Sequence, residues 1–495
     1  MADGIDNQIT QSGGPFMRSE SNFPGIKSIA MKLFFSLLFF VFTTSAIHAD
    51  DTAAIYSSPP KQTKEQRNAR MAWWREAKFG MFIHFGLFSE AGGYWQGKPV
   101  GNLGEWMMKI AHISVADYAT LATTFNPVQF NADQWVALAK SSGMKYIVIT
   151  AKHHEGFAMY HTRLDKFNIV DATPFKRDVI KEMSDACTRQ GLKFGIYYSQ
   201  DQDWHHAGGG LSGAKIWDPA QVGDKTQYVR DVDVPQVKEL LTNYGPVAEF
   251  WWDCYGLNKE QADILLPLLA MQPKMLVNDR LGGNVRGDFG TPEGHIPEGV
   301  ERDDWETCMT FNDTWGYKKD DHNWKSPETL IHQLVDIVSK NGNYLLNVGP
   351  DGQGEIPAAS VERLRAVGKW VTVNGESIYG AQPTIFGPEL GGPSPTKKDA
   401  QGRPVFVTAW KWRCTVKPAA AGSGQASKVF IHLFVWPGET FTLAHMKSQV
   451  TKAYLLADPH KTLLTIRQNG ADLTVSRLPD KAPDPIDTVL CLETK

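Results

Sequence analysis

Cysteine is scarce in this chain, with only five among 495 residues. No two of them form a Cys-x-x-Cys pair, and none has the spacing of a metal-ligand set, so the cysteines predict neither a zinc site nor a disulfide framework. An odd number also leaves at least one thiol unpaired if the chain is exported. We expect them mainly to fill the core, while a disulfide between some of them stays open. The five are Cys187, Cys254, Cys308, Cys414 and Cys491.

The sequence also lacks an excess of charge of either sign. There are 51 basic and 54 acidic residues, which gives a formal net charge of -3. Such a balance gives no reason to expect nucleic acid or an anionic membrane surface as a partner. Internal repeats and low-complexity tracts are absent as well, which argues against a repeat architecture.

No apolar run is long enough for a comfortable membrane span of about 20 residues, and no stable membrane insertion is expected. The short apolar run 33–42 follows Met31-Lys32 and precedes small residues up to Ala46 and Ala49, a pattern typical of a secretory signal peptide. Cleavage after Ala46 or Ala49 would export the protein, to a periplasmic, secreted or lysosomal-type compartment. An internal signal-anchor is the alternative. The predicted N-terminal segments are a start-site extension (1–30), a signal peptide (31–49) and a linker (50–66).

Apolar strands that alternate with helices fill the following 300 residues and predict a parallel sheet. About seven such units suit a closed barrel better than an open sheet. The fold class is therefore α/β, a (β/α)8-like TIM barrel over 67–382. We expect strands at 79–84, 145–151, 193–199, 247–253, 274–280, 304–309 and 343–349. We expect helices at 115–125, 132–142, 177–191, 232–244, 260–270, 327–340 and 358–373.

The pattern changes after Gly380, where prolines and paired glycines mark a boundary. Short strands separated by turns follow, and they predict a small C-terminal β-sandwich over 383–495. The expected strands are 405–412, 428–435, 440–443 and 452–455, with a similar tail from 463 to 488.

A carboxylate follows the most apolar of the predicted strands. Residues 247–252 are apolar and aromatic apart from Glu249, and Asp253 comes directly after two tryptophans. In a barrel the strand carboxyl ends form the mouth, so Asp253 is placed to meet a substrate. Tryptophan faces beside it suit the carbon face of a sugar ring. An isolated aspartate would more often cap the next helix, but other predicted strands also end on polar side chains.

Three histidines stand at two other strand ends, His84 in the first and His153 with His154 in the second. They permit two interpretations, hydrogen bonding to sugar hydroxyls or a metal site. Neither an His-x-His nor an His-Glu-x-x-His spacing occurs there, which favours the hydroxyls.

Further polar residues lie at or near strand ends: Tyr197 and Tyr198, the pair Glu105-Trp106, and Arg280. Arg280 could bind hydroxyls or favour ionisation of a nearby carboxylate, or serve only as a partner of Asp279. Tyr198 could equally belong to the core.

The loop after Arg280 is rich in carboxylates, which usually indicates solvated surface. Hydrolysis of a glycoside, however, needs one ionised and one protonated carboxyl group. Asp253 fits the first role and one acid of this loop the second, but the spacing alone does not select it. The candidates are Asp288, Glu293, Glu298, Glu301, Asp303 and Asp304.

Together these motifs resemble glycoside hydrolase family 29, the α-L-fucosidases, in order from about residue 70 to 380. The combination is highly specific, whereas the C-terminal part resembles the family only in outline. The chain departs from the family pattern at Cys254, where glycine is common, and at Phe85, where tryptophan is common. The motifs are Ile83-His84-Phe85-Gly86, Lys152-His153-His154-Glu155-Gly156-Phe157, Tyr197-Tyr198-Ser199, Phe250-Trp251-Trp252-Asp253, Asn278-Asp279-Arg280, Trp305-Glu306-Thr307-Cys308, Leu345-Leu346-Asn347-Val348-Gly349-Pro350-Asp351-Gly352 and Asn374-Gly375-Glu376-Ser377-Ile378-Tyr379-Gly380.

The resemblance implies a retaining double displacement with an aspartate nucleophile and a glutamic acid/base. Asp253 matches the nucleophile motif. Glu293 is the predicted acid/base, because 288–293 resembles the family's Asp-Phe…Glu segment, and Glu298 and Glu301 are reserves. The implied substrate-binding residues are His84, Glu105, Trp106, His153, His154, Tyr197 and Arg280.

We therefore expect an exported, exo-acting α-L-fucosidase that needs no metal and no organic cofactor. Its partner would be a fucosylated oligosaccharide or glycoconjugate; the oligomeric state stays open. Two other classes are possible: a metal-dependent barrel hydrolase that uses the three histidines, and a sugar-binding protein without catalysis.

Overall fold

A computed structural model describes residues 62–210, 215–399, 401–419 and 426–495. The predicted start-site extension, the signal peptide and most of the linker lie outside these residues. Within the described part of the chain, no helix has the length and apolar character needed to cross a membrane. All five cysteines lie in the described ranges, and each is a free thiol.

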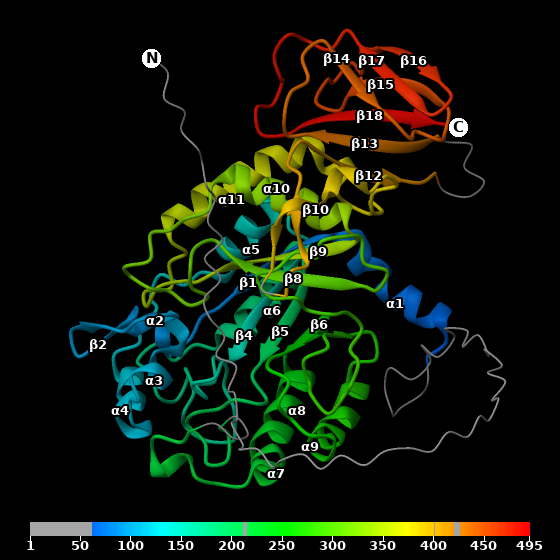
Figure 1. Ribbon diagram of the computed structural model, residues 1–495. Coiled ribbons are helices and arrows are strands. Elements are labelled where there is room, and N and C mark those ends of the chain that lie inside the picture. The colour runs from blue at the N-terminus through cyan, green and yellow to red at the C-terminus, as the bar shows by residue number, and fades with distance from the viewer. Residues whose placement is uncertain (1–61, 211–214, 400, 420–425) are drawn as a thin grey trace, which may run out of the picture. The chain divides into compact units, whose positions relative to one another are not determined.

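Seven parallel strands form the central sheet, and the barrel prediction is confirmed (Figure 1). Five-residue β1 and seven-residue β4 are buried along their whole length, as expected for strands covered on both faces. The strands occur in the order β7-β6-β5-β4-β1-β9-β8. Their bounds are β1 Phe79–Ile83, β4 Tyr146–Lys152, β5 Lys193–Tyr198, β6 Glu249–Trp252, β7 Leu276–Val277, β8 Trp305–Thr310 and β9 Gly342–Val348.

The predicted helices surround this sheet within one or two residues of their expected ends in most cases (Figure 1). Helix α6 shows why these limits could be read from the sequence. The Asp178 side chain accepts a hydrogen bond from Lys181 N at its start, and Gly191 ends it with a left-handed φ of 77°. The main helices are α1 Lys64–Ala77, α5 Ala132–Ser141, α6 Val179–Gln190, α8 Val234–Asn243, α9 Lys259–Leu265, α10 Pro327–Ser339 and α11 Ala358–Asn374.

A three-residue segment, 288–290, completes the barrel between β7 and β8. Isolated parallel bridges pair Asn278 with Phe289 and Gly290 with Trp305. Gly290 N donates to Asp304 O at 3.0 Å, and Glu306 N donates to Gly290 O at 2.9 Å. The segment therefore takes the place of an eighth strand, although the sequence predicted only a loop there.

Helix α1 holds this segment in place. Two guanidinium nitrogens of Arg70 lie 2.5 and 2.6 Å from the Asp288 carboxylate, a bidentate pair. Arg75 forms a similar pair with Asp304, at 2.7 Å for both contacts. The Trp74 ring stacks on Phe289 with a centroid separation of 4.9 Å. Charge pairs and aromatic packing thus fasten the segment that fills the eighth strand position.

The C-terminal region forms two facing antiparallel sheets, as predicted for a β-sandwich. The expected strand 405–412 is wrong in part, because residues 409–411 separate two strands that pair with different neighbours. Strands β10 and β18 were not predicted; β10 lies in the proline- and glycine-rich boundary. One sheet contains β12 Trp412–Lys417, β13 Ser427–Leu433, β18 Thr488–Thr494 and β15 Val450–Leu455; the other β14 Thr440–Leu443, β17 Asp472–Ser476 and β16 Thr465–Asn469; and β10 Gly391–Lys398 pairs with β11 Pro404–Thr408.

A buried arginine connects the barrel to the sandwich. Arg413 of β12 is fully buried, and its Nε atom donates to Asp336 of α10. Lys340 Nζ lies 3.0 Å from the other Asp336 oxygen, so the buried charges compensate each other. Gln382 pairs with Val416 of β12 through two backbone hydrogen bonds. We propose the domain boundary at residues 382 and 383 on this basis.

Two carboxyl groups face each other inside the barrel. Glu249 and Glu306 lie two residues before Trp251 and Cys308 on the same strand faces, and both are at most 1% exposed. The Tyr146 hydroxyl and the Trp251 indole donate to Glu306. Burial raises the pKa of Glu306 to about 7, and burial together with Glu306 raises the pKa of Glu249 well above its usual value. The pair therefore retains a proton near neutral pH.

This pair predicts a pH-dependent stability. Because the folded state raises the pKa of Glu306 from 4.5 to about 7, its contribution is complete below 4.5 and is lost as the pH rises through about 7. For Glu306 alone the free energy of unfolding should fall by about 3 kcal/mol over that interval, and the raised pKa of Glu249 adds to the fall. In Glu249→Gln the amide can donate to an ionised Glu306, so this fall should be smaller. Urea unfolding of both proteins at about pH 5 and about pH 8 measures it; equal falls would contradict the assignment.

Candidate active site

Most of the predicted site residues lie just beyond the carboxyl ends of the parallel strands or in the loops that follow them. Because these ends lie on one side of the barrel, side chains far apart in the sequence become neighbours. The rings of His84, His153, His154 and Tyr197 are in mutual contact, with centroids 4.1 to 5.5 Å apart in the contacting pairs. Trp106 contacts His154 edge to face at 5.4 Å.

Asp253 lies at the centre of this cluster and is 14% exposed. Its Oδ2 accepts a hydrogen bond from the Tyr197 hydroxyl at 2.6 Å, and its Oδ1 accepts one from Arg280 Nη1 at 2.9 Å. Burial alone raises the pKa of Asp253, but the charge of Arg280 and the hydrogen bond from the Tyr197 hydroxyl outweigh it and hold the pKa well below its usual value. Asp253 is therefore an ionised carboxylate at any physiological pH.

Arg280 is held rigidly on its other edge. Its Nε and Nη2 atoms donate to the side chain and the backbone oxygen of Thr291, both at 2.9 Å. Its guanidinium carbon lies 4.6 Å from the centroid of the Trp251 ring. Only Nη1 faces the carboxylates, and it contacts both Asp253 and Glu293. The arginine thus sets the distance between these two acids.

Glu293 lies at the edge of the cluster, with its side chain 47% exposed. Its Oε2 is 2.8 Å from Arg280 Nη1, and Asp253 Oδ1 is 2.9 Å from the same atom. The two oxygens cannot be farther apart than the sum of these distances. This limit on the nearest oxygens is compatible with the roughly 5–5.5 Å between the carboxyl groups of retaining glycosidases.

The other acids of this loop are less suitably placed. Asp288 and Asp304 form the pairs with α1 described above. Glu301 N donates to Lys340 O just before β9, at the amino ends of the strands and therefore opposite the cluster. The charge of Glu298 acts on the same Lys340. These contacts favour Glu293 over Glu298 and Glu301 as the acid/base.

Two histidines have a defined tautomer in their neutral form. Asn347 Nδ2 donates to Trp315 O, so Asn347 Oδ1 accepts from His84 Nδ1 at 2.7 Å. Ser199 Oγ donates to Gln202 O and accepts from His154 Nδ1 at 2.6 Å. Burial lowers the pKa of His84 to about 3 and that of His154 well below its usual value. Each neutral ring then offers an unprotonated Nε2.

Glu105 and His153 are also buried. Glu105 Oε2 accepts from Gly316 N at 2.8 Å and from the Thr314 hydroxyl at 3.0 Å. Burial raises the pKa of Glu105, although the charge of His153 opposes the shift. His153 Nδ1 lies 3.5 Å from Glu155, a fully buried carboxylate.

The structure adds supporting residues that the sequence did not single out: Asn347, Ser199, Thr291 and Glu155. Asn347 and Ser199 carried a weak signal, since each is a polar residue at the end of an apolar strand. Thr291 had none, because its role depends on its contact with Arg280, and Glu155 appeared only as a member of the family motif 152–157.

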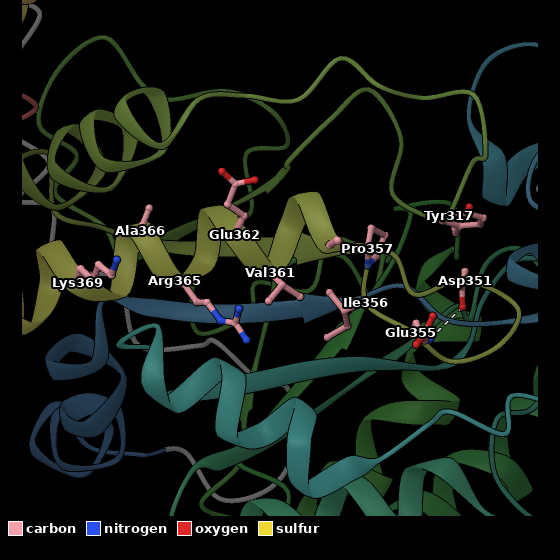
Figure 2. A pocket seen from close by; sticks show the side chains of 11 residues that line it. Tyr317, Asp351, Glu355, Ile356, Pro357, Val361, Glu362, Arg365, Ala366 and Lys369 are labelled. Carbon is pink, nitrogen blue, oxygen red and sulfur yellow. Dashed lines mark hydrogen bonds between the residues drawn. The ribbon is translucent and has the colours of Figure 1, made fainter.

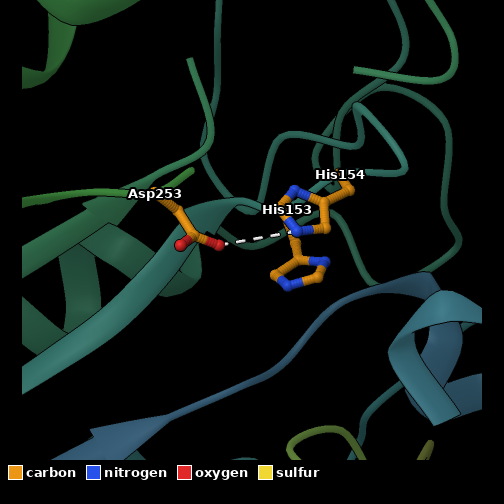
Figure 3. Close-up of side chains that lie close together, drawn as sticks. All are labelled: His153, His154 and Asp253. Carbon is orange, nitrogen blue, oxygen red and sulfur yellow. Dashed lines mark ion pairs between the residues drawn. The ribbon is translucent and has the colours of Figure 1, made fainter. Parts of the chain in front are cut away.

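Three of these side chains could hold a metal ion. One ligand atom each from His153, His154 and Asp253 lies within 4.8 Å of the other two (Figure 3). This is the set that the sequence left open between hydroxyl binding and metal binding.

A cavity of about 840 Å³ lies elsewhere, along the exposed side of α11 (Figure 2). Tyr317 and Asp351 line one end of it, and Arg365 and Lys369 line the other. None of the nine predicted site residues contributes to its wall. The cavity is therefore separate from the cluster around Asp253.

Comparison with known proteins places the chain among characterised relatives. The family model described as "Alpha-L-fucosidase" matches residues 44–376. The tissue alpha-L-fucosidase of Bos taurus is 34% identical over 354 residues, which cover 66% of this chain and 73% of that protein. The plasma alpha-L-fucosidase of Homo sapiens is 35% identical over 342 residues, covering 64% and 71%.

Solved structures agree with these sequence matches. The alpha-L-fucosidase of Vibrio sp. strain EJY3 superposes with a TM-score of 0.75 at 32% identity, over 87% of this chain and 74% of that one. Alpha-L-fucosidase isoenzyme 1 of Paenibacillus thiaminolyticus gives a TM-score of 0.71 at 32% identity, over 87% and 99%.

Proposed function

The chain belongs to the α-L-fucosidase family, and we propose that it removes terminal α-L-fucose by a double displacement in which Asp253 is the nucleophile and Glu293 the acid/base. It is a glycoside hydrolase that retains configuration, as its family does. Its partners are fucosylated glycans, and the matches favour neither a metal-dependent hydrolase nor a sugar-binding protein without catalysis. Export by way of the segment 31–49 is part of the proposal.

The observation that carries this assignment is the shared contact of Asp253 and Glu293 with Arg280 Nη1. It brings an enclosed, ionised carboxylate and a half-exposed one close together. A short separation suits a retaining enzyme, in which the ionised acid attacks the sugar itself and water enters only in the second step. Arg280 also prevents protonation of the nucleophile, since its charge lowers the pKa of Asp253.

The reaction then follows from the two positions. A carboxylate oxygen of Asp253 bonds to the anomeric carbon while the bond to the leaving oxygen breaks and Glu293 transfers its proton to that oxygen. In the second step Glu293 takes a proton from water, the water oxygen attacks the anomeric carbon, and the bond to Asp253 breaks. Both carboxyl groups end in their starting protonation states.

The remaining residues suit the binding of hydroxyl groups. The Nε2 atoms of neutral His84 and His154 accept hydrogen bonds from sugar hydroxyls, and Glu105 also acts as an acceptor. Arg280 and Tyr197 donate. Trp106 offers a half-buried ring beside His154. Either Trp106 or Phe311, the buried residue directly after β8, is proposed to cover the C-5 methyl group of fucose.

The stereochemistry of the first product tests this mechanism. Hydrolysis of an aryl α-L-fucoside should release α-L-fucose first, because two inversions restore the starting configuration. Proton NMR during the first minutes, before mutarotation, distinguishes the anomers. Early appearance of β-L-fucose would refute the double displacement, whereas complete inertness would refute the activity itself.

A further inference from the structure

We propose that His153, His154 and Asp253 form an inhibitory site for a divalent transition metal such as Zn²⁺, and that the metal and the fucosyl group exclude each other. Competition with substrate rests on the proposed function, whereas the metal site itself rests on the geometry. The three side chains come from the ends of β4 and β6, the two neighbours of β5, and are largely buried (Figure 3).

The spacing of two ligands already matches a metal site. His154 Nε2 lies 3.5 Å from Asp253 Oδ2. Zinc bonds histidine nitrogen and carboxylate oxygen at about 2.0–2.2 Å in tetrahedral geometry, which separates two ligand atoms by roughly 3.4 Å. A ring nitrogen of His153 lies within 4.8 Å of both and supplies a third ligand after a small adjustment. Water can complete the coordination.

The two closest atoms also lack a proton between them. The only hydrogen of the Ser199 hydroxyl goes to Gln202 O, so His154 uses its own Nδ1 hydrogen to bind Ser199. In this tautomer Nε2, which faces Asp253 Oδ2 at 3.5 Å, carries the lone pair that an ion would bind.

Ser199 further fixes the orientation of the ring, as outer hydrogen bonds do for metal-binding histidines. The metal would bind Asp253 Oδ2 and His154 Nε2, the nitrogen that is proposed to accept a hydrogen bond from a sugar hydroxyl. It would therefore block substrate rather than assist the reaction.

Two measurements on the full-length protein test the proposal. ZnCl₂ should raise the KM for an aryl α-L-fucoside at least about tenfold without a change in kcat. Calorimetry should show one Zn²⁺ bound per chain, and saturation with L-fucose should weaken that binding at least about tenfold. His153→Asn should weaken zinc binding at least about tenfold as well.

Two variants serve as controls. His322→Gln removes an exposed histidine and should leave zinc binding unchanged. Cys254→Ser should also leave it unchanged; loss of zinc binding there would identify the thiol as the ligand and overturn the proposal. Zinc binding that is insensitive to L-fucose would overturn it too, even if His153→Asn fails to fold. If L-fucose displaces zinc but the protein has no fucosidase activity, the proposed function is refuted and the metal site is not.

Discussion

Replacing Asp253 by alanine is expected to lower kcat/KM for an aryl α-L-fucoside by about 10⁴-fold or more. The loss is large because no glycosyl-enzyme can form and the charge beside the anomeric carbon disappears. Steady-state hydrolysis at high enzyme concentration measures it. The exposed Asp303, altered to alanine, is the matched control and should keep full activity.

Azide separates the loss of the nucleophile from a damaged fold. In Asp253→Ala, azide can enter from the face that the carboxylate occupied, and a single inversion then gives β-L-fucosyl azide. Recovery of turnover with that product would support the assignment. Activity of Asp253→Ala close to that of the unaltered protein would reject Asp253 as the nucleophile.

Glu293→Ala is expected to have the second largest effect, a loss of about 10²–10⁴-fold on oligosaccharides whose leaving oxygen needs a proton. For aryl fucosides with acidic leaving groups, the rate of the first step should fall much less. The glycosyl-enzyme would then accumulate, because no base activates water. A burst of phenol followed by slow turnover is the expected time course.

The azide product again distinguishes the role. In Glu293→Ala, azide attacks the intermediate on Asp253, and two inversions yield α-L-fucosyl azide, opposite to the product of Asp253→Ala. Glu298→Ala is the matched control and should be unaffected, given its place near Lys340. If Glu298→Ala shows the burst and Glu293→Ala does not, the two roles are exchanged.

Much of the fold could be predicted from the sequence because apolar strands and capped helices are local signals. Strands β1, β4, β5 and β9 lie within one or two residues of their expected limits. The expected strand 274–280 shrinks to two residues in β7, and the eighth position is filled by 288–290. Neither the shortening of β7 nor the new strand position could be predicted. The segment 288–290 has only three residues, and with an aspartate and a glycine among them it shows no strand pattern.

The site was predicted as a set of residue types rather than as an arrangement. Strand ends and the family resemblance together pointed to Asp253, the histidines and Arg280, and the structure brings these side chains into contact. The choice among the loop acids depended on which one reaches Arg280, a contact over 13 residues of irregular chain. The tautomers of His84 and His154 depended on Asn347 and Ser199, which lie 263 and 45 residues away in the sequence.

The pairs between α1 and the short segment 288–290 have a practical consequence for anyone who shortens this protein. Arg70 and Asp288 are 218 residues apart, yet that contact anchors the stretch of chain that leads to Thr291 and Glu293. A cut beyond Arg75 would delete no proposed catalytic side chain, but it would release the support beneath the proton donor. Expression variants should therefore begin ahead of Thr63, whose side chain caps α1.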